Sequence, residues 1–273
     1  MNDSPAQTEA ATDQAPPPDI DVTQPHAARL WNYWMGGKDN FAADRAAGDY
    51  VAEVYPDIVT MAKVSREMLV RMVSFLARDA GIRQFLDVGA GLPTMQNTHQ
   101  VAQRVAPDSR IVYVDNDPLV LVHARALLAD TTPEGVTAYV EADYNNPEAI
   151  IAESRNVLNF DEPIAMMLMG VLGYVEDLGE RRSIVNQLIE PLAPGSYLAL
   201  WDGAATGEAV VAGGEKLAES GAVPYYLLSP DDLAQCFDGL EMVEPGLVQL
   251  THWRPDTDDP QPIDAYGAVA RKP

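Results

Sequence analysis

The pattern of apolar residues changes near residue 81. Before it, over residues 57–76, apolar side chains recur every three or four positions, at Met61, Val64, Met68, Met72 and Phe75. This spacing predicts an amphipathic helix, and Gly81 is well placed to end it. We therefore expect the segment from Pro25 to Gly81 to form a helical cap.

After Gly81, short apolar runs alternate with helical segments. The runs expected to form strands are 83–88, 110–115, 136–141, 164–169 and 195–201. Strands that alternate with helices of about 10–15 residues indicate a mostly parallel sheet covered on both faces. Runs 240–250 and 265–270 have no helix between them, which predicts a C-terminal antiparallel hairpin at the sheet edge. The expected fold class is α/β, a Rossmann-like doubly wound sheet.

Composition suggests three parts. Residues 1–24 are Ala, Thr, Gln, Pro and acidic residues, a mixture that cannot bury enough surface to fold alone, so a disordered tail is expected. The helical cap covers 25–81. The domain 82–273 is expected to contain the sheet and the binding site.

Charge and cysteine content narrow the function. With 18 Lys and Arg against 41 Asp and Glu, the net charge is −23. Such a surface repels phosphate backbones and anionic lipids, so neither nucleic acid nor membrane is an expected partner. Cys236 is the single cysteine, which excludes an intrachain disulfide and a thiolate zinc cluster and fits a reducing, cytoplasmic location. No metal site is expected.

The segment from Phe85 to Thr94 carries the main chemical signal. A strand ends on Asp87, a Gly89-Ala90-Gly91 turn follows, and a helix comes next. Glycines let such a turn tighten and let a ligand approach the backbone. Asp115 ends the following strand, where a carboxylate can accept both hydroxyls of a ribose. Together these features predict a site for an adenosine-type ligand.

The same segment favours one adenosine ligand over others. A dinucleotide fingerprint has a third glycine where this chain has Thr94. Asp87 would repel a pyrophosphate and accept an ammonium group. S-adenosylmethionine is therefore favoured over NAD or FAD, and a nucleotide-dependent oxidoreductase is the disfavoured alternative.

Several motifs resemble those of class I S-adenosylmethionine-dependent methyltransferases. They are Asp87–Gly91, Tyr113–Asp117 and Glu141–Tyr144, whereas Pro93 departs from the usual pattern. The opening segment Pro25–Arg45 is similar to that of a bacterial family of S-adenosyl methyltransferases long described as a domain of unknown function. Further matches to that family are Leu168–Tyr174, Trp253–Pro255 and Tyr266–Ala270. The resemblance implies S-adenosylmethionine as cofactor and methyl transfer as activity.

The resemblance also implies roles for single residues. The glycine turn would approach the methionine part of the cofactor, Asp115 the ribose, and Asp143 the adenine amine. The expected cofactor-binding residues are Tyr33, Gly36, Asn40, Asp87, Gly89, Ala90, Gly91, Asp115, Asn116, Asp143, Tyr144, Met169 and Gly170. The alternatives are a helix cap for Asp115, a polar turn for Asp143 and core packing for Met169.

The segment from Trp31 to Phe41 has an unusual composition. Four aromatic residues, Trp31, Tyr33, Trp34 and Phe41, bracket the pair Gly36-Gly37. Aromatic side chains exclude water and glycines allow hinge motion, so a lid over the pocket is predicted. The alternatives are a helix packed on the sheet and a contact in a homodimer.

The catalytic residues and the acceptor are less defined. A general base is needed only if the acceptor must lose a proton, and the candidates are His26 and His252, with Tyr33 and Tyr174 as orienting groups. The Asn/Asp-Pro-Pro-Tyr/Phe motif of nucleic-acid amino-methyltransferases is absent from 169–174. A small-molecule acceptor is therefore expected. The alternative is a non-catalytic module, a sensor or partner protein, that binds S-adenosylmethionine or S-adenosylhomocysteine.

Overall fold

The computed structural model describes residues 20–93, 96–127 and 132–273. Within these ranges eight strands form one sheet, in the order β3-β2-β1-β4-β5-β8-β6, with β7 also paired to β8. Strands β1 to β5 run parallel, and β8 is antiparallel to β5. The strands are β1 (Gln84–Val88), β2 (Arg110–Asp115), β3 (Val136–Glu141), β4 (Ala165–Met169), β5 (Tyr197–Gly203), β6 (Glu241–Met242), β7 (Val248–Gln249) and β8 (Ala265–Arg271). The predicted α/β fold class is confirmed.

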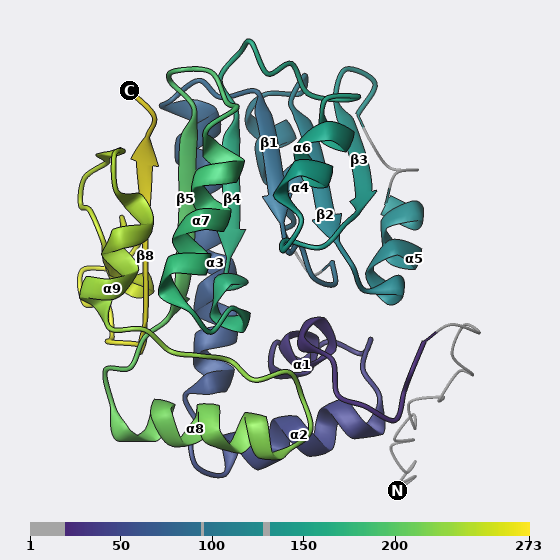
Figure 1. Cartoon of the computed structure of the whole chain (residues 1–273), viewed down its shortest axis with the longest axis vertical. Helices are drawn as coiled ribbons and strands as arrows, with labels where there is room; N and C mark the ends of the chain where they lie inside the picture. The colour runs from purple at the N-terminus through teal and green to yellow at the C-terminus, as the bar shows by residue number, and fades with distance from the viewer. Residues whose placement is uncertain (1–19, 94–95, 128–131) are drawn as a thin grey trace, which may run out of the picture.

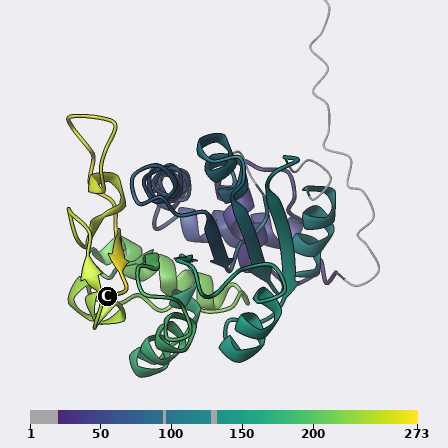
Figure 2. The ribbon, with the colours of Figure 1, turned by 90° about the horizontal axis from the view of Figure 1, so that it is seen from above.

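Helices cover both faces of the sheet, as Figure 2 shows for α3 and α7 on opposite sides of the strands. The helices of the described ranges are α1 (Ala27–Trp34), α2 (Ala42–Ala52), α3 (Ile58–Arg78), α4 (Thr98–Val105), α5 (Pro118–Leu127), α6 (Pro147–Ser154), α7 (Leu178–Ile189), α8 (Glu208–Glu219) and α9 (Pro230–Ala234). Successive strand residues point to opposite faces. Phe85 packs in one core with α3 and α4, and Leu86 in a second core with α6 and α7.

The long helix of the cap agrees closely with its apolar spacing. Met61, Met68 and Met72 are buried against the sheet. Gly81 has a φ of +72°, a left-handed conformation that favours glycine. The amide of Ile82 then donates to the carbonyl of Leu76 at 2.8 Å and closes the helix end.

The C-terminal region differs in detail from its prediction. The run 240–250 forms two short strands, β6 and β7, rather than one, and both pair with β8. Pro245 lies between them, and a proline has no amide hydrogen for a sheet ladder. The short strands form the edge of the sheet and β8 lies between them and β5, so the predicted antiparallel hairpin at the sheet edge is confirmed.

Three helices that precede or follow the central strands gather below the carboxyl ends of β1, β2, β4 and β5. Figure 1 shows α1, α2 and α8 side by side there, and the contacts between α1 and α2 and between α2 and α8 agree. The strand order reverses between β1 and β4. In sheets of this kind, ligands bind at such a reversal, outside the carboxyl ends of the strands.

Candidate functional site

A cavity of about 190 Å³ lies at the reversal point, between the carboxyl edge of the sheet and α1. Its floor is made by the ends of β1 and β2, including Gly89, Gly91 and Asp115. Met169 and Trp201 line it from β4 and β5. The cavity therefore spans the edge from the second strand to the fifth.

The glycine turn after β1 is held tightly against β2. The amides of Gly89 and Ala90 both donate to the carbonyl of Val114, at 2.9 and 3.1 Å. Gly89 has a φ of +74°, and a Cβ there would lie 2.5 Å from Cγ2 of Val171. Gly91 has a φ of +64° and open space where its Cβ would be. The turn thus leaves a hollow that side chains would fill.

Asp115 joins this turn to the end of β2. Its side chain is 8% exposed, and its Oδ2 accepts the amide of Gly91 at 2.8 Å while its Oδ1 accepts the amide of Asp117 at 2.9 Å. Burial raises the pKa of this carboxyl, and the two amides oppose that shift. Each carboxylate oxygen can accept more than one hydrogen bond, so Asp115 keeps acceptor capacity toward the cavity.

Asp117, rather than Asp115, has the capping role at α5. Its Oδ1 accepts the amide of Leu119 at 2.8 Å, in the first turn of that helix. Its Oδ2 lies 2.8 Å from Nδ1 of His26. Burial pushes the pKa of Asp117 upward, but its contacts with His26 outweigh burial and the net shift is downward.

The end of β3 completes this side of the cavity. Asn116 and Tyr144 line it, and the Nδ2 of Asn116 donates to the Oδ2 of Asp143 at 3.2 Å. The Oδ1 of Asp143 accepts the amide of Asn145 at 2.8 Å. Asp143 does not line the cavity itself and reaches it through Asn116.

Helix α1 forms the opposite wall. His26, Ala27, Ala28, Trp31 and Met35 line the cavity. The ring of Trp31 packs edge-on against Trp34 and Trp201, with centroids 5.6 and 5.7 Å away. The covering segment is therefore 26–35, which overlaps the predicted lid 31–41 only in part.

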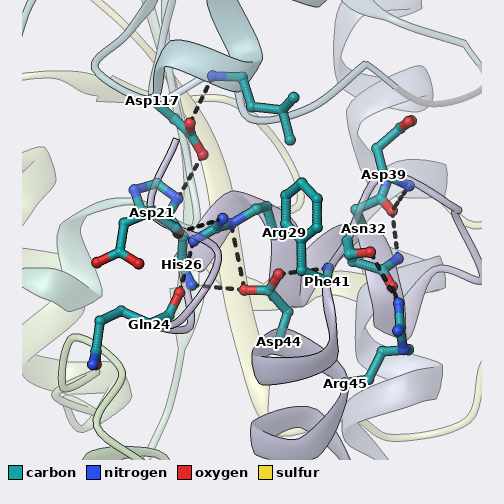
Figure 3. A network of polar contacts seen from close by, with 12 residues as sticks. Asp21, Gln24, His26, Arg29, Asn32, Asp39, Phe41, Asp44, Arg45 and Asp117 are labelled. Carbon is teal, nitrogen blue, oxygen red and sulfur yellow. Dashed lines mark hydrogen bonds and ion pairs between the residues drawn. The ribbon is translucent and has the colours of Figure 1, made fainter. Parts of the chain in front are cut away.

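A buried polar network fixes this segment (Figure 3). The guanidinium of Arg29 donates to the carbonyls of Asp21 and Gln24, at 2.9 and 2.8 Å, and its Nε lies 3.4 Å from Asp44. Asp44, on α2, also accepts the amide of His26 at 2.9 Å. Residues 20–24 of the segment expected as a tail are thus attached to α1, whereas residues 1–19 lie outside the described ranges.

The family can be assigned at this point. Residues 13–273 match the model of a family described as S-adenosyl methyltransferase. The chain belongs to this S-adenosyl methyltransferase family. It is accordingly an S-adenosylmethionine-dependent methyltransferase, and the predicted recognition, activity and cofactor are confirmed.

Solved structures agree with this assignment. A DUF574 family protein from Streptomyces avermitilis is 42% identical, with a TM-score of 0.88 over 93% of this chain and 99% of that chain. A proposed methyltransferase from Thermobifida fusca is 41% identical, with a TM-score of 0.87 over 94% and 98%. An S-adenosylmethionine-dependent methyltransferase from Anabaena variabilis, 16% identical, has a TM-score of 0.50 over 94% and 97% and shares the fold alone. None of the curated proteins compared with the chain matches it.

Some residues predicted for the cofactor site of this methyltransferase lie elsewhere. Tyr33 donates its hydroxyl to Asp49 at 2.6 Å, and Asn40 donates to the Oδ1 of Asn32 at 3.0 Å. Gly36 has a φ of +80° just after α1. The described cavity lining includes none of these three residues. Their contacts shape the loop between α1 and α2.

Asp87 lies beneath the glycine turn rather than in the cavity. It is 4% exposed, and its Oδ2 accepts the hydroxyl of Thr98 at 2.6 Å. Burial raises the pKa of Asp87 to about 6, with Thr98 and Arg66 opposing the shift. Thr94, where the third glycine of a dinucleotide site would be, is outside the described residues.

Helix α3 also lines the cavity, and this contribution was not predicted from the sequence. Ser65, Arg66 and Leu69 line the cavity beside the glycine turn. Arg66 donates through Nη2 to Asn97 at 3.3 Å, and within the described residues its buried Nε has no hydrogen-bond partner. The available signal was a cation on the same helix face as Leu69, three positions later. Whether this cation faces the cavity depends on how α3 packs against the sheet, which its own sequence does not show.

Proposed function

We propose that this methyltransferase binds S-adenosylmethionine in the 190 Å³ cavity and methylates a small organic molecule. The observation that carries the proposal is Asp115, a buried carboxylate that braces the glycine turn and retains acceptor capacity beside the cavity. A ribose offers two adjacent hydroxyl donors, and a carboxylate at the end of a second strand matches them. The hollow above Gly91 supports the same assignment.

The cavity lining supports one orientation of the ligand. Asn116 and Tyr144 would take the adenine edge and ring, because both line the cavity near Asp115. The methionine part would lie over Gly89 and Gly91. Arg66, with its buried Nε free among the described residues, would bind the carboxylate of that part. Arginine suits this role because its planar donors match a carboxylate.

The protein's own contribution to the reaction would be alignment and exclusion of water. S-adenosylmethionine supplies an already electrophilic methyl group, so positioning the acceptor accounts for much of the rate. Trp31 and Met35 of α1 cover the cavity and exclude water from it. Of the four catalytic candidates, His26 and Tyr174 line the cavity, whereas Tyr33 and His252 do not.

The net charge supports a small-molecule acceptor. A charge of −23 disfavours a nucleic-acid substrate, because it repels the phosphate backbone.

The location of the protein is a separate point. No helix in the described ranges is both long and apolar enough to cross a membrane. The buried free thiol of Cys236 is compatible with the reducing cytoplasm, which we propose as the location. The homodimer stays a prediction.

The proposal is tested by calorimetric titration of the full chain with S-adenosylmethionine, S-adenosylhomocysteine and NAD. We expect the first two to bind with micromolar-class affinity and to raise the melting temperature, because a ligand of the native state stabilises it. Labelled S-adenosylmethionine incubated with a whole-cell extract should then give a labelled small molecule. Tight NAD binding without S-adenosylmethionine binding would overturn the proposal, and so would label found in nucleic acid alone.

A further inference from the structure

A second, smaller cavity of about 50 Å³ adjoins the first. Trp31 and Tyr174 line both of them. Its other walls come from α2, α3, α8 and the segment 225–227, and include Val51, Ile58, Met61, Val210, Leu217 and Leu227. The two cavities therefore meet at one aromatic boundary.

This boundary lies at the end of the first cavity that is remote from the proposed ribose site. Tyr174 follows β4, next to Met169 and Gly170, and the ring of Trp31 packs on Trp201 of β5. Asp115 ends β2, and in the sheet β1 and β4 lie between β2 and β5. A molecule in the second cavity would thus approach the ligand from its methionine side.

The second cavity is almost entirely apolar. Of the described residues that line it, none is charged. Two of its three tyrosine hydroxyls have carboxylate partners: Tyr55 donates to Asp264 at 3.2 Å, and Tyr225 donates to Asp202. A charged occupant would lose its hydration without gaining a counter-ion, which costs several kcal/mol.

Aromatic rings dominate the walls near the boundary. Tyr174 packs edge-on against Tyr225 at 5.0 Å between centroids, and Trp31 packs edge-on against Trp34 at 5.6 Å. Such walls favour an aromatic occupant, whose ring gains both apolar burial and edge-to-face contacts. On α8, Gly214 contributes no side chain and so leaves room for it, whereas Gly213 is packed closely against Tyr55.

We propose that the second cavity binds the methyl acceptor, and that the part of the acceptor it holds is uncharged and no larger than a single aromatic ring, because the cavity has a volume of only about 50 Å³. This inference rests on the proposed function, because it requires S-adenosylmethionine in the adjoining cavity. It adds the class of substrate and the surface that selects it.

The test uses the full chain saturated with S-adenosylhomocysteine and a matched pair of single-ring probes, phenol and benzoate. They share a ring and differ in charge. Calorimetry should show binding of phenol and at least tenfold weaker binding of benzoate. Equal binding of the two, or no binding of phenol, would overturn the inference.

Substitutions in α8 test whether the probe binds in the second cavity. A Cβ on Gly214 would meet the carbonyl of Tyr225 at 3.5 Å and Leu227 at 3.9 Å, which are ordinary contacts. Gly214→Leu should therefore fold, fill the cavity and weaken phenol binding at least tenfold. Gly214→Ala should weaken it less. Ala218→Leu, at an exposed position of the same helix, should leave it unchanged.

The outcomes separate the two proposals. Both Gly214 variants should bind S-adenosylhomocysteine like wild type, since Gly214 does not line the first cavity. If S-adenosylhomocysteine binds but phenol binding is unaffected by either Gly214 substitution, the inference fails and the proposed function stands. If wild type does not bind S-adenosylhomocysteine, both fail. Should Gly214→Leu melt early, Gly214→Ala decides the result.

Discussion

The floor and the cover of the cofactor cavity are built differently. The floor combines Val88–Gly91 with Asp115, on two adjacent parallel strands whose register pairs Asp87 with Tyr113 and Val88 with Val114. The cover combines α1 and one side of α3, and the adjoining second cavity adds α2, α8 and residues 225–227. Backbone pairing places the floor residues together, whereas side-chain packing over long sequence separations places the cover.

The difference explains which motifs can be interpreted locally. The carboxyl ends of paired parallel strands meet at one edge, whatever the side chains between them. A helix before the first strand has no such constraint. The position of α1 depends on contacts such as Arg29 with Asp44 and Trp31 with Trp201.

The largest effect is expected from removing the carboxylate in the floor of the cavity. Asp115→Ala should weaken S-adenosylhomocysteine binding about a thousandfold, because two ribose hydroxyls would each lose a charged acceptor worth about 1.5–3 kcal/mol. Calorimetric titration measures it on a variant with a native circular dichroism spectrum. Asp108→Ala is the control, since that exposed side chain lies outside the cavity. Unchanged affinity for Asp115→Ala would restrict this residue to bracing the turn.

A second prediction concerns the cover. Arg66→Met should weaken S-adenosylhomocysteine binding about thirtyfold, as expected for the loss of a partly buried ion pair of about 2 kcal/mol. Binding of methylthioadenosine, which lacks the amino-acid part, should not change. Lys63→Met, exposed on the same helix, is the control. An equal loss for both ligands would mean that Arg66 supports the turn and does not bind the carboxylate.

The third prediction concerns Asp87 beneath the turn. Its folded pKa of about 6 lies above the value of 3.8 for an unperturbed Asp. Between these two pH values the folded state binds more protons than the unfolded state, so stability falls as pH rises from about 4 to about 6. In Asp87→Asn, the decrease in the free energy of unfolding over this pH range should be about 2 kcal/mol smaller than in the wild type. Denaturation of both proteins at pH 4 and pH 7 without ligand measures it, and a parallel fall in the two would contradict it.

The smallest expected effect uses a pair of glycines. Gly91 and Gly81 have similar φ values, +64° and +72°, and open space at the Cβ position, but of the two Gly91 alone lines the cavity. Substitution by Ala at either position should lower the free energy of unfolding by about 1–2 kcal/mol, because of backbone strain. Only Gly91→Ala should also weaken S-adenosylhomocysteine binding, by about tenfold. Equal affinities of the two variants would place the ligand away from the turn.

The sequence predicted the sheet and the floor because both depend on local signals. Apolar runs with intervening helices identified β1 to β5, and glycine and acid spacing identified Gly89, Gly91 and Asp115. Tyr33 of α1 and Asn40 of the following loop showed the opposite case. Their polar groups pair with Asp49 and Asn32, partners that composition does not reveal.

The residues that cover the cavity could not be predicted, because they come together only through packing between separate segments. Ser65 and Arg66 look like ordinary positions of a long helix until the sheet is placed beside them. The second cavity depends on Val51, Leu217 and Leu227, which are up to 176 positions apart in the sequence. No short motif encodes such an assembly, since each segment is an unremarkable apolar helix or loop by itself.

A crystal structure of the full chain grown with S-adenosylhomocysteine tests the central claim most directly. We predict that the ribose hydroxyls lie within hydrogen-bond distance of Asp115 and that the homocysteine part crosses Gly89 and Gly91 toward Met169. The carboxylate should meet Arg66, and α1 should cover the ligand. A ligand bound outside this cavity, or inside it with the ribose away from Asp115, would contradict the account.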